Sequence, residues 1–453
     1  MAIIIQQEPT SPGMANSDIV FNIQSNEVAQ PQFQYVMDIY YSGSGTLLQR
    51  IKQQPNPNSK GVFNVGQILK SFLASDDAWK ADLIHTSSYA NRDFSIAFGE
   101  EYGTSLSSSI TLYNGISATP GNPAKSGSEF YTFTNGLVDP YDAVNWNFNS
   151  SSYYAAPSAS QYITYDYNHV LSNGPVTQSI NDGDYATIAL YNGNFDNDSV
   201  FAQDIYYIQY TYYNAAGASV GTDSYTNTIA NGGGPRTNAN DLWSDGGVYN
   251  GQDGSTRLLH IGVGPQNLVD AGNTLPATWD SYKVEIQGQG DDGQENNDGI
   301  FATRWFTKAT GECSYNGVRF AWKNEFGVWD YYTFTLQSNS TFGIERQSYE
   351  QTFVDYSTGN TSVPYNKQRR GTKQFYNALN NVKTANSNWL TQAEADWLRE
   401  LFFSADVYIQ EGTEMLPVAI SSANMVEKTN PRTQKNFQYT IEFSPANQLR
   451  PRE

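Results

Sequence analysis

Apolar and polar residues alternate over much of the first hundred residues, a pattern that predicts strands with one buried face. The alternation is clearest at 19–23, 33–41 and 94–98. Two prolines within 53–58 interrupt it and predict a loop, because proline cannot donate a ladder hydrogen bond. The apolar spacing of 65–73 then predicts one short helix packed against the sheet.

The middle of the chain predicts a second β domain. Candidate strands lie at 186–191, 204–213 and 281–286. The segment 204–213 carries aromatic or aliphatic residues at both odd and even positions, so we expect this strand to be central or covered on both faces. The intervals between the strands fit an immunoglobulin-like sandwich.

The last third predicts a hairpin, a helix and further strands. Apolar alternation at 318–322 and 329–334 flanks a short turn with Asn and Gly, which indicates a hairpin. Thr391 and Glu394 have the spacing of a capping box and precede a helical apolar stripe, which predicts a helix near 391–403. Additional strands are predicted at 407–409, 417–420 and 437–443.

These elements predict a mainly β protein with a multidomain β-sandwich/barrel architecture and a few short helices. A length of 453 residues suggests about three domains. We expect an N-terminal β domain with one short helix at 1–102, a Ser/Asn/Tyr-rich excursion or linker at 103–162, an immunoglobulin-like β-sandwich at 163–310 and a C-terminal β domain at 311–453. The 14% aromatic content suits strands, in which rings pack well.

Charge and rare residues exclude several functions. A net charge of −19 opposes extended contact with nucleic-acid phosphates. One cysteine, Cys313, cannot form an internal disulfide, and His85, His169 and His260 are far apart in sequence, which leaves little for zinc or redox chemistry. We therefore expect no cofactor, no metal and no catalytic residues. The sequence lacks a signal-peptide pattern at its N-terminus and an apolar run of about 20 residues, so we expect folding in the cytosol without membrane insertion.

Acidic and aromatic residues leave two other functions open. The densest acidic segment, 291–299, lacks the residue order of an EF-hand loop and is expected to be a solvated loop. Two short Asp pairs, at 182–184 and 196–198, could bind calcium, but such pairs are common in an Asp-rich chain. A glycosidase needs only two carboxylates, and tyrosine-rich strands could stack sugar rings, although filling a sandwich core explains the same composition.

Two segments are candidates for subunit contacts. Tyr153 and Tyr154 belong to the aromatic excursion, which we expect to pack on a neighbouring subunit or on its own domain. Residues 361–453 hold 11 Lys plus Arg and 9 Asp plus Glu, so this segment carries +2 and the rest carries −21. Its basic cluster is a solvated loop or a site that docks with other copies or with acidic neighbours in an ordered assembly. The cluster consists of Lys367, Arg369, Arg370 and Lys373.

Three blocks of the sequence carry a resemblance to a known class of proteins: 33–40 with 55–57 and 61–65, the aromatic and glycine block 317–332, and the ending 439–446. With these blocks the chain resembles the structural, tail and baseplate-type proteins of tailed bacteriophage virions, particularly those of phages that infect marine and gut Bacteroidota. The resemblance implies a noncatalytic building block of the virion, present in several copies, whose partners are other copies of itself and other virion proteins. Such a family has no catalytic residues to carry over.

The prediction from sequence is therefore a phage virion protein of the tail or tail tip that acts through subunit–subunit contacts and is assembled in the host bacterial cytoplasm. One alternative is a carbohydrate-binding or host-receptor-binding virion protein, with a host surface glycan as its partner. The other is a polysaccharide depolymerase, which requires two carboxylates that face each other across a groove.

Overall fold

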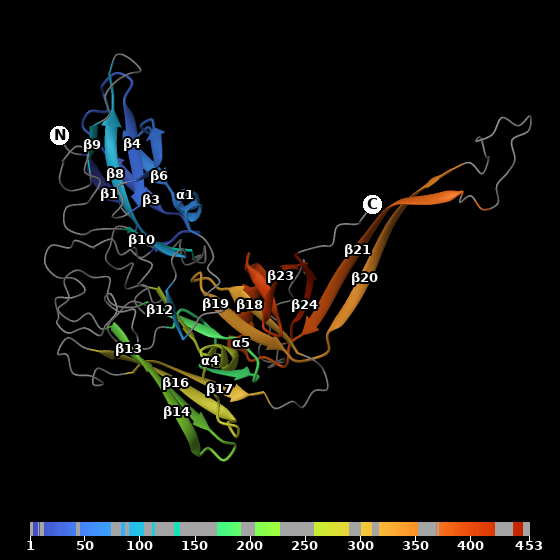
Figure 1. Ribbon diagram of the computed structural model, residues 1–453. Helices are drawn as coiled ribbons and strands as arrows, with labels where there is room; N and C mark the ends of the chain where they lie inside the picture. Colours follow the sequence, from blue (N-terminus) through green and yellow to red (C-terminus); the bar gives the residue numbers. More distant parts are fainter. Residues whose placement is uncertain are drawn as a thin grey trace, which may run out of the picture. The chain divides into compact units, whose positions relative to one another are not determined.

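The computed structural model describes residues 3–7, 9, 13–41, 46–73, 83–86, 90–103, 111–113, 131–135, 170–191, 204–226, 258–289, 300–309, 317–351, 368, 371–421 and 438–446. These residues form a mainly β protein with a few short helices, as the alternation predicts (Figure 1). The chain divides into two compact units. The first unit holds Met1–Thr310 with Lys323–Tyr331, and the second holds Gly311–Trp322 with Tyr332–Glu453.

The N-terminal part of the first unit consists of two facing sheets. The smaller sheet has the order β1 (Ile4–Gln7), β3 (Val20–Gln24) and β6 (Lys60–Asn64). The larger has the order β2 (Gly13–Met14), β10 (Tyr131–Thr134), β8 (Asn91–Glu101), β4 (Gln34–Tyr41) and β5 (Leu47–Gln53), and β9 (Thr111–Tyr113) also pairs with β8.

The inward side chains of these two sheets form one apolar core. Phe21 of β3 and Phe98 of β8 lie with ring centroids 5.4 Å apart, so the two sheets are in direct contact. Tyr35 is fully buried in the same core, and its hydroxyl donates to the Ser59 carbonyl at 2.8 Å. The expected short helix is confirmed as α1 (Gly66–Lys70), which adds the buried Leu69 to this core.

The second part of the first unit contains two more sheets. A five-stranded sheet has the order β11 (Thr177–Ile180), β17 (Ile300–Lys308), β16 (Ser281–Gln289), β13 (Asp204–Tyr213) and β14 (Ser219–Thr226). A three-stranded sheet has the order β12 (Thr187–Tyr191), β15 (Leu258–Gly262) and β7 (Ile84–Thr86), and α4 (Pro265–Asp270) follows β15. The expectation of a central strand at 204–213 is confirmed, because β13 lies between β16 and β14.

Tyrosine hydroxyls join these two sheets. The hydroxyls of Tyr210 and Tyr282 donate to the backbone carbonyls of Gly262 and Val263, each at 2.8 Å. Both rings are fully buried. A buried hydroxyl without an acceptor would cost about 1–3 kcal/mol, so each ring is useful in this core only because its oxygen finds a carbonyl.

The interval 103–162 differs in part from the excursion that was expected. β9 and β10 both lie within it and pair with β8 of the N-terminal sheet. Their three and four residues are too few to show periodicity in the sequence, which is why the interval gave no strand signal. Residues 104–110, 114–130 and 136–162, Tyr153 and Tyr154 among them, lie outside the described part of the chain.

Within 163–310, the spacing of strands along the sequence does not specify which strands pair or in which direction. β11 and β17 pair in parallel, and β15 pairs with β7, a strand from within the first hundred residues. The immunoglobulin-like topology of this interval stays a prediction, because 192–203, 227–257 and 290–299 lie outside the described residues.

The second unit is built on a seven-stranded sheet. Its order is β19 (Trp329–Phe334), β18 (Val318–Lys323), β22 (Val407–Glu411), β23 (Glu414–Ile420), β24 (Thr440–Pro445), β21 (Thr372–Asn386) and β20 (Asn339–Glu350). The predicted hairpin is confirmed as β18 and β19, which are neighbours in this sheet. Its turn is closed by the Asn324 side-chain oxygen, which accepts from the backbone N–H groups of Phe326 and Val328.

The predicted helix and its capping box are also confirmed. α5 (Gln392–Phe403) begins after Thr391, whose hydroxyl accepts from the Glu394 backbone N–H while the Glu394 carboxylate accepts from the Thr391 backbone N–H. The helix buries Trp397 against Trp322 of β18, with ring centroids 5.1 Å apart. This core supports the sheet from whose edge β21 and β20 extend.

Candidate functional site

The candidate functional site is a two-stranded arm, defined here as residues 339–350 of β20 and 372–382 of β21. β20 pairs with β21 from Asn339 to Glu350, and β24 pairs with β21 only at Lys383–Asn386. Within the described residues, the strands of the arm therefore pair only with each other. Figure 1 shows β20 and β21 running side by side away from β23 and β24 of the same unit.

The arm differs from the other strands in its exposure. All twelve residues of β20 are exposed, as are 372–377 of β21. In a packed sheet, at least one face of a strand is covered by another layer. Neither face of β20 is covered by the described residues, so the arm is a ribbon without a core.

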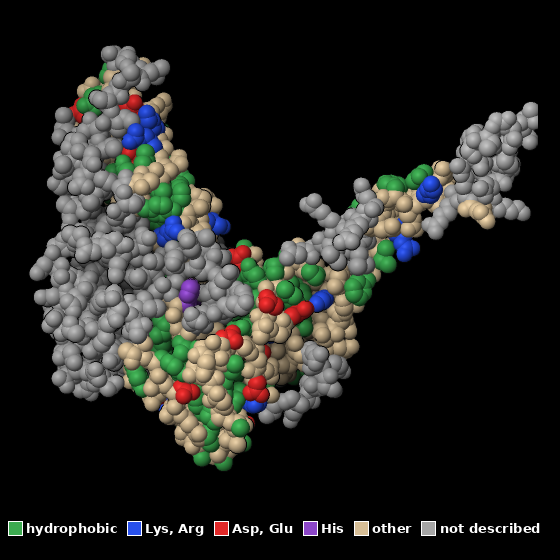
Figure 2. Space-filling model, in the orientation of Figure 1, with side chains coloured by type: hydrophobic (Ala, Val, Ile, Leu, Met, Phe, Trp, Pro, Cys, Tyr) green, Lys and Arg blue, Asp and Glu red, His purple; other side chains and the backbone are tan. Residues whose placement is uncertain are grey.

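The arm also displays large apolar side chains. Phe342 and Ile344 on β20 are 59% and 57% exposed, and Phe375 on β21 is 61% exposed. Tyr349 and Tyr376 are also exposed, and Figure 2 shows hydrophobic side chains along the arm. Single exposed apolar residues are ordinary, but several on one thin element make the arm a candidate binding surface.

The strand register distributes these residues over both faces of the ribbon. Phe342 and Ile344 are two residues apart on β20 and so share one face. Tyr349 is at an odd position of β20 and lies on the other face, opposite Lys373. Phe375 is the extra residue of a β-bulge opposite Gln347 and Ser348, and its ring lies 6.2 Å from that of Tyr349. One apolar pair therefore lies near the root and a second, on the opposite face, lies further out.

The root of the arm is firmly held in the second unit. Ala385 of β21 is fully buried and pairs with the buried Ile441 of β24. The Lys383 ammonium lies 3.1 Å from the Glu411 carboxylate, and the Asn386 side-chain amide donates to the Gln337 carbonyl at 2.7 Å. Because β21 is one continuous strand from root to arm, its packed end sets the direction of its exposed end.

The predicted basic cluster has one member on this arm. Lys373 is an exposed residue of β21, not of a loop, because β20 supplies its ladder partner. Lys367, Arg369 and Arg370 lie outside the described residues, as do Tyr153 and Tyr154. The sequence pattern did not reveal the arm itself. Its only signal is two short apolar groups, at 342–344 and 375–376, which lack a one-sided alternation because neither face is buried.

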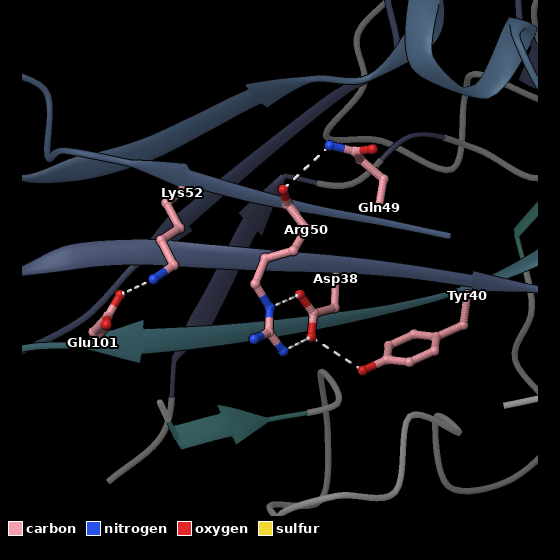
Figure 3. A network of polar contacts seen from close by, with 6 residues as sticks. All are labelled: Asp38, Tyr40, Gln49, Arg50, Lys52 and Glu101. Carbon is pink, nitrogen blue, oxygen red and sulfur yellow. Dashed lines mark hydrogen bonds and ion pairs between the residues drawn. The ribbon is translucent and has the colours of Figure 1, made fainter. Parts of the chain in front are cut away.

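A separate polar network lies on β4, β5 and β8 of the N-terminal sheet (Figure 3). The Arg50 guanidinium donates to both oxygens of the fully buried Asp38 carboxylate, at 2.7 and 2.6 Å, and the Tyr40 hydroxyl donates to the same carboxylate at 3.0 Å. Burial, followed by the nearby Asp38 charge, raises the pKa of Tyr40 to about 12. Lys52 and Glu101 form a neighbouring ion pair at 2.6 Å. Bidentate pairing satisfies the buried carboxylate, which indicates a structural role.

Two of the three histidines are neighbours in space although they are far apart in sequence. His260 of β15 and His85 of β7 are register partners, with ring centroids 6.5 Å apart. His260 is buried, and neither of its ring nitrogens has a hydrogen-bond partner among the described residues. Burial, with smaller contributions from His85 and Lys323, lowers the pKa of His260 to about 3. This histidine is therefore neutral at physiological pH.

Other kinds of site are less developed in the described residues. No three His, Cys, Asp or Glu side chains of the described residues gather closely enough to hold a metal ion. The cavity lined by Thr187, Arg304 and Tyr331 has a volume of about 10 Å³, room for about one water molecule. None of the helices in the described ranges is long and apolar enough to cross a membrane.

Comparisons with known proteins add no relative: no protein-family model matches the sequence, and neither does any curated protein.

The buried Asp38–Arg50 ion pair is expected to stabilise the folded chain. Arg50→Ala leaves a buried carboxylate without its counter-charge, so we expect a loss of about 3 kcal/mol in the free energy of unfolding. The matched control is Lys52→Ala, which removes a more exposed ion pair of the same sheet and should cost about 0.5 kcal/mol. Urea unfolding of the three proteins measures both values. Equal losses for the two variants would contradict the structural role of the buried pair.

The burial of His260 predicts how the stability of the protein depends on pH. Its folded-state pKa of about 3 lies below the unfolded value near 6.5, so the unfolded chain binds the extra proton first and stability falls as the pH drops below 6.5. Between pH 7 and pH 5 this one group should cost the wild type about 2 kcal/mol. The free energy of unfolding of His260→Leu should not show this loss between pH 7 and pH 5. The exposed control His85→Gln should lose the same amount as the wild type. Urea unfolding at both pH values makes the comparison, and an identical pH dependence in all three proteins would refute it.

Proposed function

We propose that the chain is a structural component of a bacteriophage virion, placed in the tail or tail tip, and that it acts through subunit–subunit contacts in a symmetric assembly. The observation that carries the proposal is the arm, whose β20 strand is exposed along its whole length. The resemblance of the sequence to tail and baseplate-type proteins supplies the class of particle.

The physics of a two-stranded ribbon supports an assembly role. An isolated hairpin is marginally stable in water, because it has no third strand or helix to bury its apolar side chains. An arm that is rooted in a packed sheet yet displays Phe342 and Phe375 to solvent gains stability when another surface covers it. A contact between an arm and a different surface of the next copy repeats from copy to copy and builds a ring or a filament.

The charge of the chain supports the same role. A net charge of −19 keeps free subunits apart and soluble before they meet their partners. It also disfavours direct contact with packaged nucleic acid, which suits a tail component better than one that lines a genome.

A glycan-binding role is the second candidate, favoured by the exposed aromatic rings of Phe375 and Trp389. Sugar rings stack on flat aromatic faces. The rings of Tyr349 and Phe375 are inclined by 51° to each other, so this pair does not form a flat platform. The assembly role accounts for the whole length of the arm, whereas the glycan role uses single rings.

The test of the proposed function uses particles purified from a phage that encodes the chain. We expect quantitative mass spectrometry to find the chain in several copies per particle, and gold-labelled antibodies against it to bind the tail. Purified chain on a glycan array should give no signal. Particles that lack the chain would overturn the proposal, and a glycan signal lost in Trp389→Ala would move the assignment to receptor binding.

A further inference from the structure

We propose that His85 and His260 form a two-ligand site for a monovalent copper ion, Cu⁺. The site lies in the three-stranded sheet of the first unit, where β15 carries one imidazole and β7 the other. It is independent of the arm, on which the proposed function rests.

The register of the sheet places the two imidazoles side by side. His260 and His85 are directly opposite each other, and opposite residues of antiparallel strands share one face of the sheet. Their ring centroids lie 6.5 Å apart. With metal–nitrogen bonds of about 2 Å, an ion between one nitrogen of each ring requires a centroid separation of about 6 Å. A small shift and rotation of the exposed His85 ring therefore brings both rings onto one ion.

The nitrogens of His260 are available as ligands. The residue is 2% exposed, yet neither Nδ1 nor Nε2 has a hydrogen-bond partner among the residues that the structure describes. Buried polar atoms are normally paired, so a buried imidazole with two unpaired nitrogens indicates a ligand that these nitrogens bind. With its pKa lowered to about 3, chiefly by burial, the ring is neutral at pH 7 and keeps a lone pair for a metal ion.

The number of ligands selects the kind of ion. On its other side, His260 has Ala189 of β12 as its register partner, a residue without a ligating side-chain atom. In the described part of the chain, no third His, Cys, Asp or Glu side chain joins the pair. Protein zinc sites have at least three protein ligands, whereas copper accepts imidazole and Cu⁺ forms linear complexes with two of them. Linear coordination leaves the angle between the ring planes free, so the observed 48° is compatible with it.

The surroundings of His260 favour an ion of low charge. Burying a charge away from water is costly, and the cost rises with the size of the charge. The Lys323 ammonium acts electrostatically on His260 and repels a divalent ion twice as strongly as a monovalent one. Exposed His85 lies on β7, at the end of the described strand order, and so gives the ion a route from solvent.

The first experiment titrates the full chain with Cu⁺ under anaerobic, reducing conditions, with bicinchoninate as a coloured competitor for the ion. All proteins carry Cys313→Ser, because a thiolate is a strong ligand for Cu⁺. The variants are His85→Gln and His260→Leu, and the matched control is His169→Gln, which removes the third histidine of the chain. Thermal melting checks folding, and the exposed position of His85 keeps the test valid even if His260→Leu unfolds.

We expect the parent protein to take one equivalent of Cu⁺ from the competitor. His85→Gln and His260→Leu should each raise the dissociation constant at least a hundredfold, whereas His169→Gln should leave it unchanged. Zn²⁺ should bind the parent at least a hundredfold more weakly than Cu⁺. The proposal is overturned if the parent binds no Cu⁺, if His85→Gln binds it as tightly as the parent, or if His169→Gln loses binding as well.

A second experiment identifies the ligands directly by X-ray absorption at the copper edge. The loaded protein should show two nitrogen ligands at one short distance and the intense edge feature of linear Cu⁺. A sulfur ligand, or three or more ligands, would contradict the two-histidine site. Neither result bears on the proposed virion role, which is tested on purified particles.

Discussion

The sandwich in the second part of the first unit depends on tyrosine hydroxyls that find acceptors across the core. Tyr210 and Tyr282 reach the carbonyls of two consecutive residues, Gly262 and Val263, and so hold the five-stranded sheet against β15. With 32 tyrosines, the chain builds much of its interior from rings, and each buried ring brings a polar oxygen that must be satisfied. Because a hydrogen bond tolerates less displacement than an aliphatic contact, this requirement restricts the relative position of the two sheets more than aliphatic packing would.

The arm differs from these packed sheets because neither face of β20 is covered by the described residues. Elsewhere in the described residues, aromatic side chains such as Phe21, Phe98 and Trp322 lie in cores between layers, and the exposed rings of Trp389 and Phe403 are single residues near the two ends of α5. On β20 and β21 the same types of side chain face solvent, although the root of the strands is packed and hydrogen-bonded. Natural proteins break local packing rules mainly where function requires it. The exposed apolar residues of the arm are therefore the observation on which the proposed assembly role rests.

The sequence predicted the elements whose burial is one-sided or whose ends are marked by specific residues. The alternation of β3, the hairpin closed at Asn324 and the capping box of Thr391 all produced correct assignments. The pairing of β7 with β15 was not predictable, because strands so far apart in sequence give no local sign of their register. The arm escaped prediction since neither face is buried. The sequence marks Lys373 only as part of a basic cluster, and the structure places it in a strand instead of a loop.

The bulge at Phe375 has a consequence for the geometry of an assembly. A regular ribbon with polar residues on both faces can slip by two residues without loss, but a bulge admits only one register. The twelve paired residues of β20 therefore span a constant length, about 40 Å at 3.4 Å per residue. In the proposed assembly, an arm of invariant length fixes the distance between its root and the surface that covers its outer end. Inserting or deleting a pair of residues on each strand would change that distance.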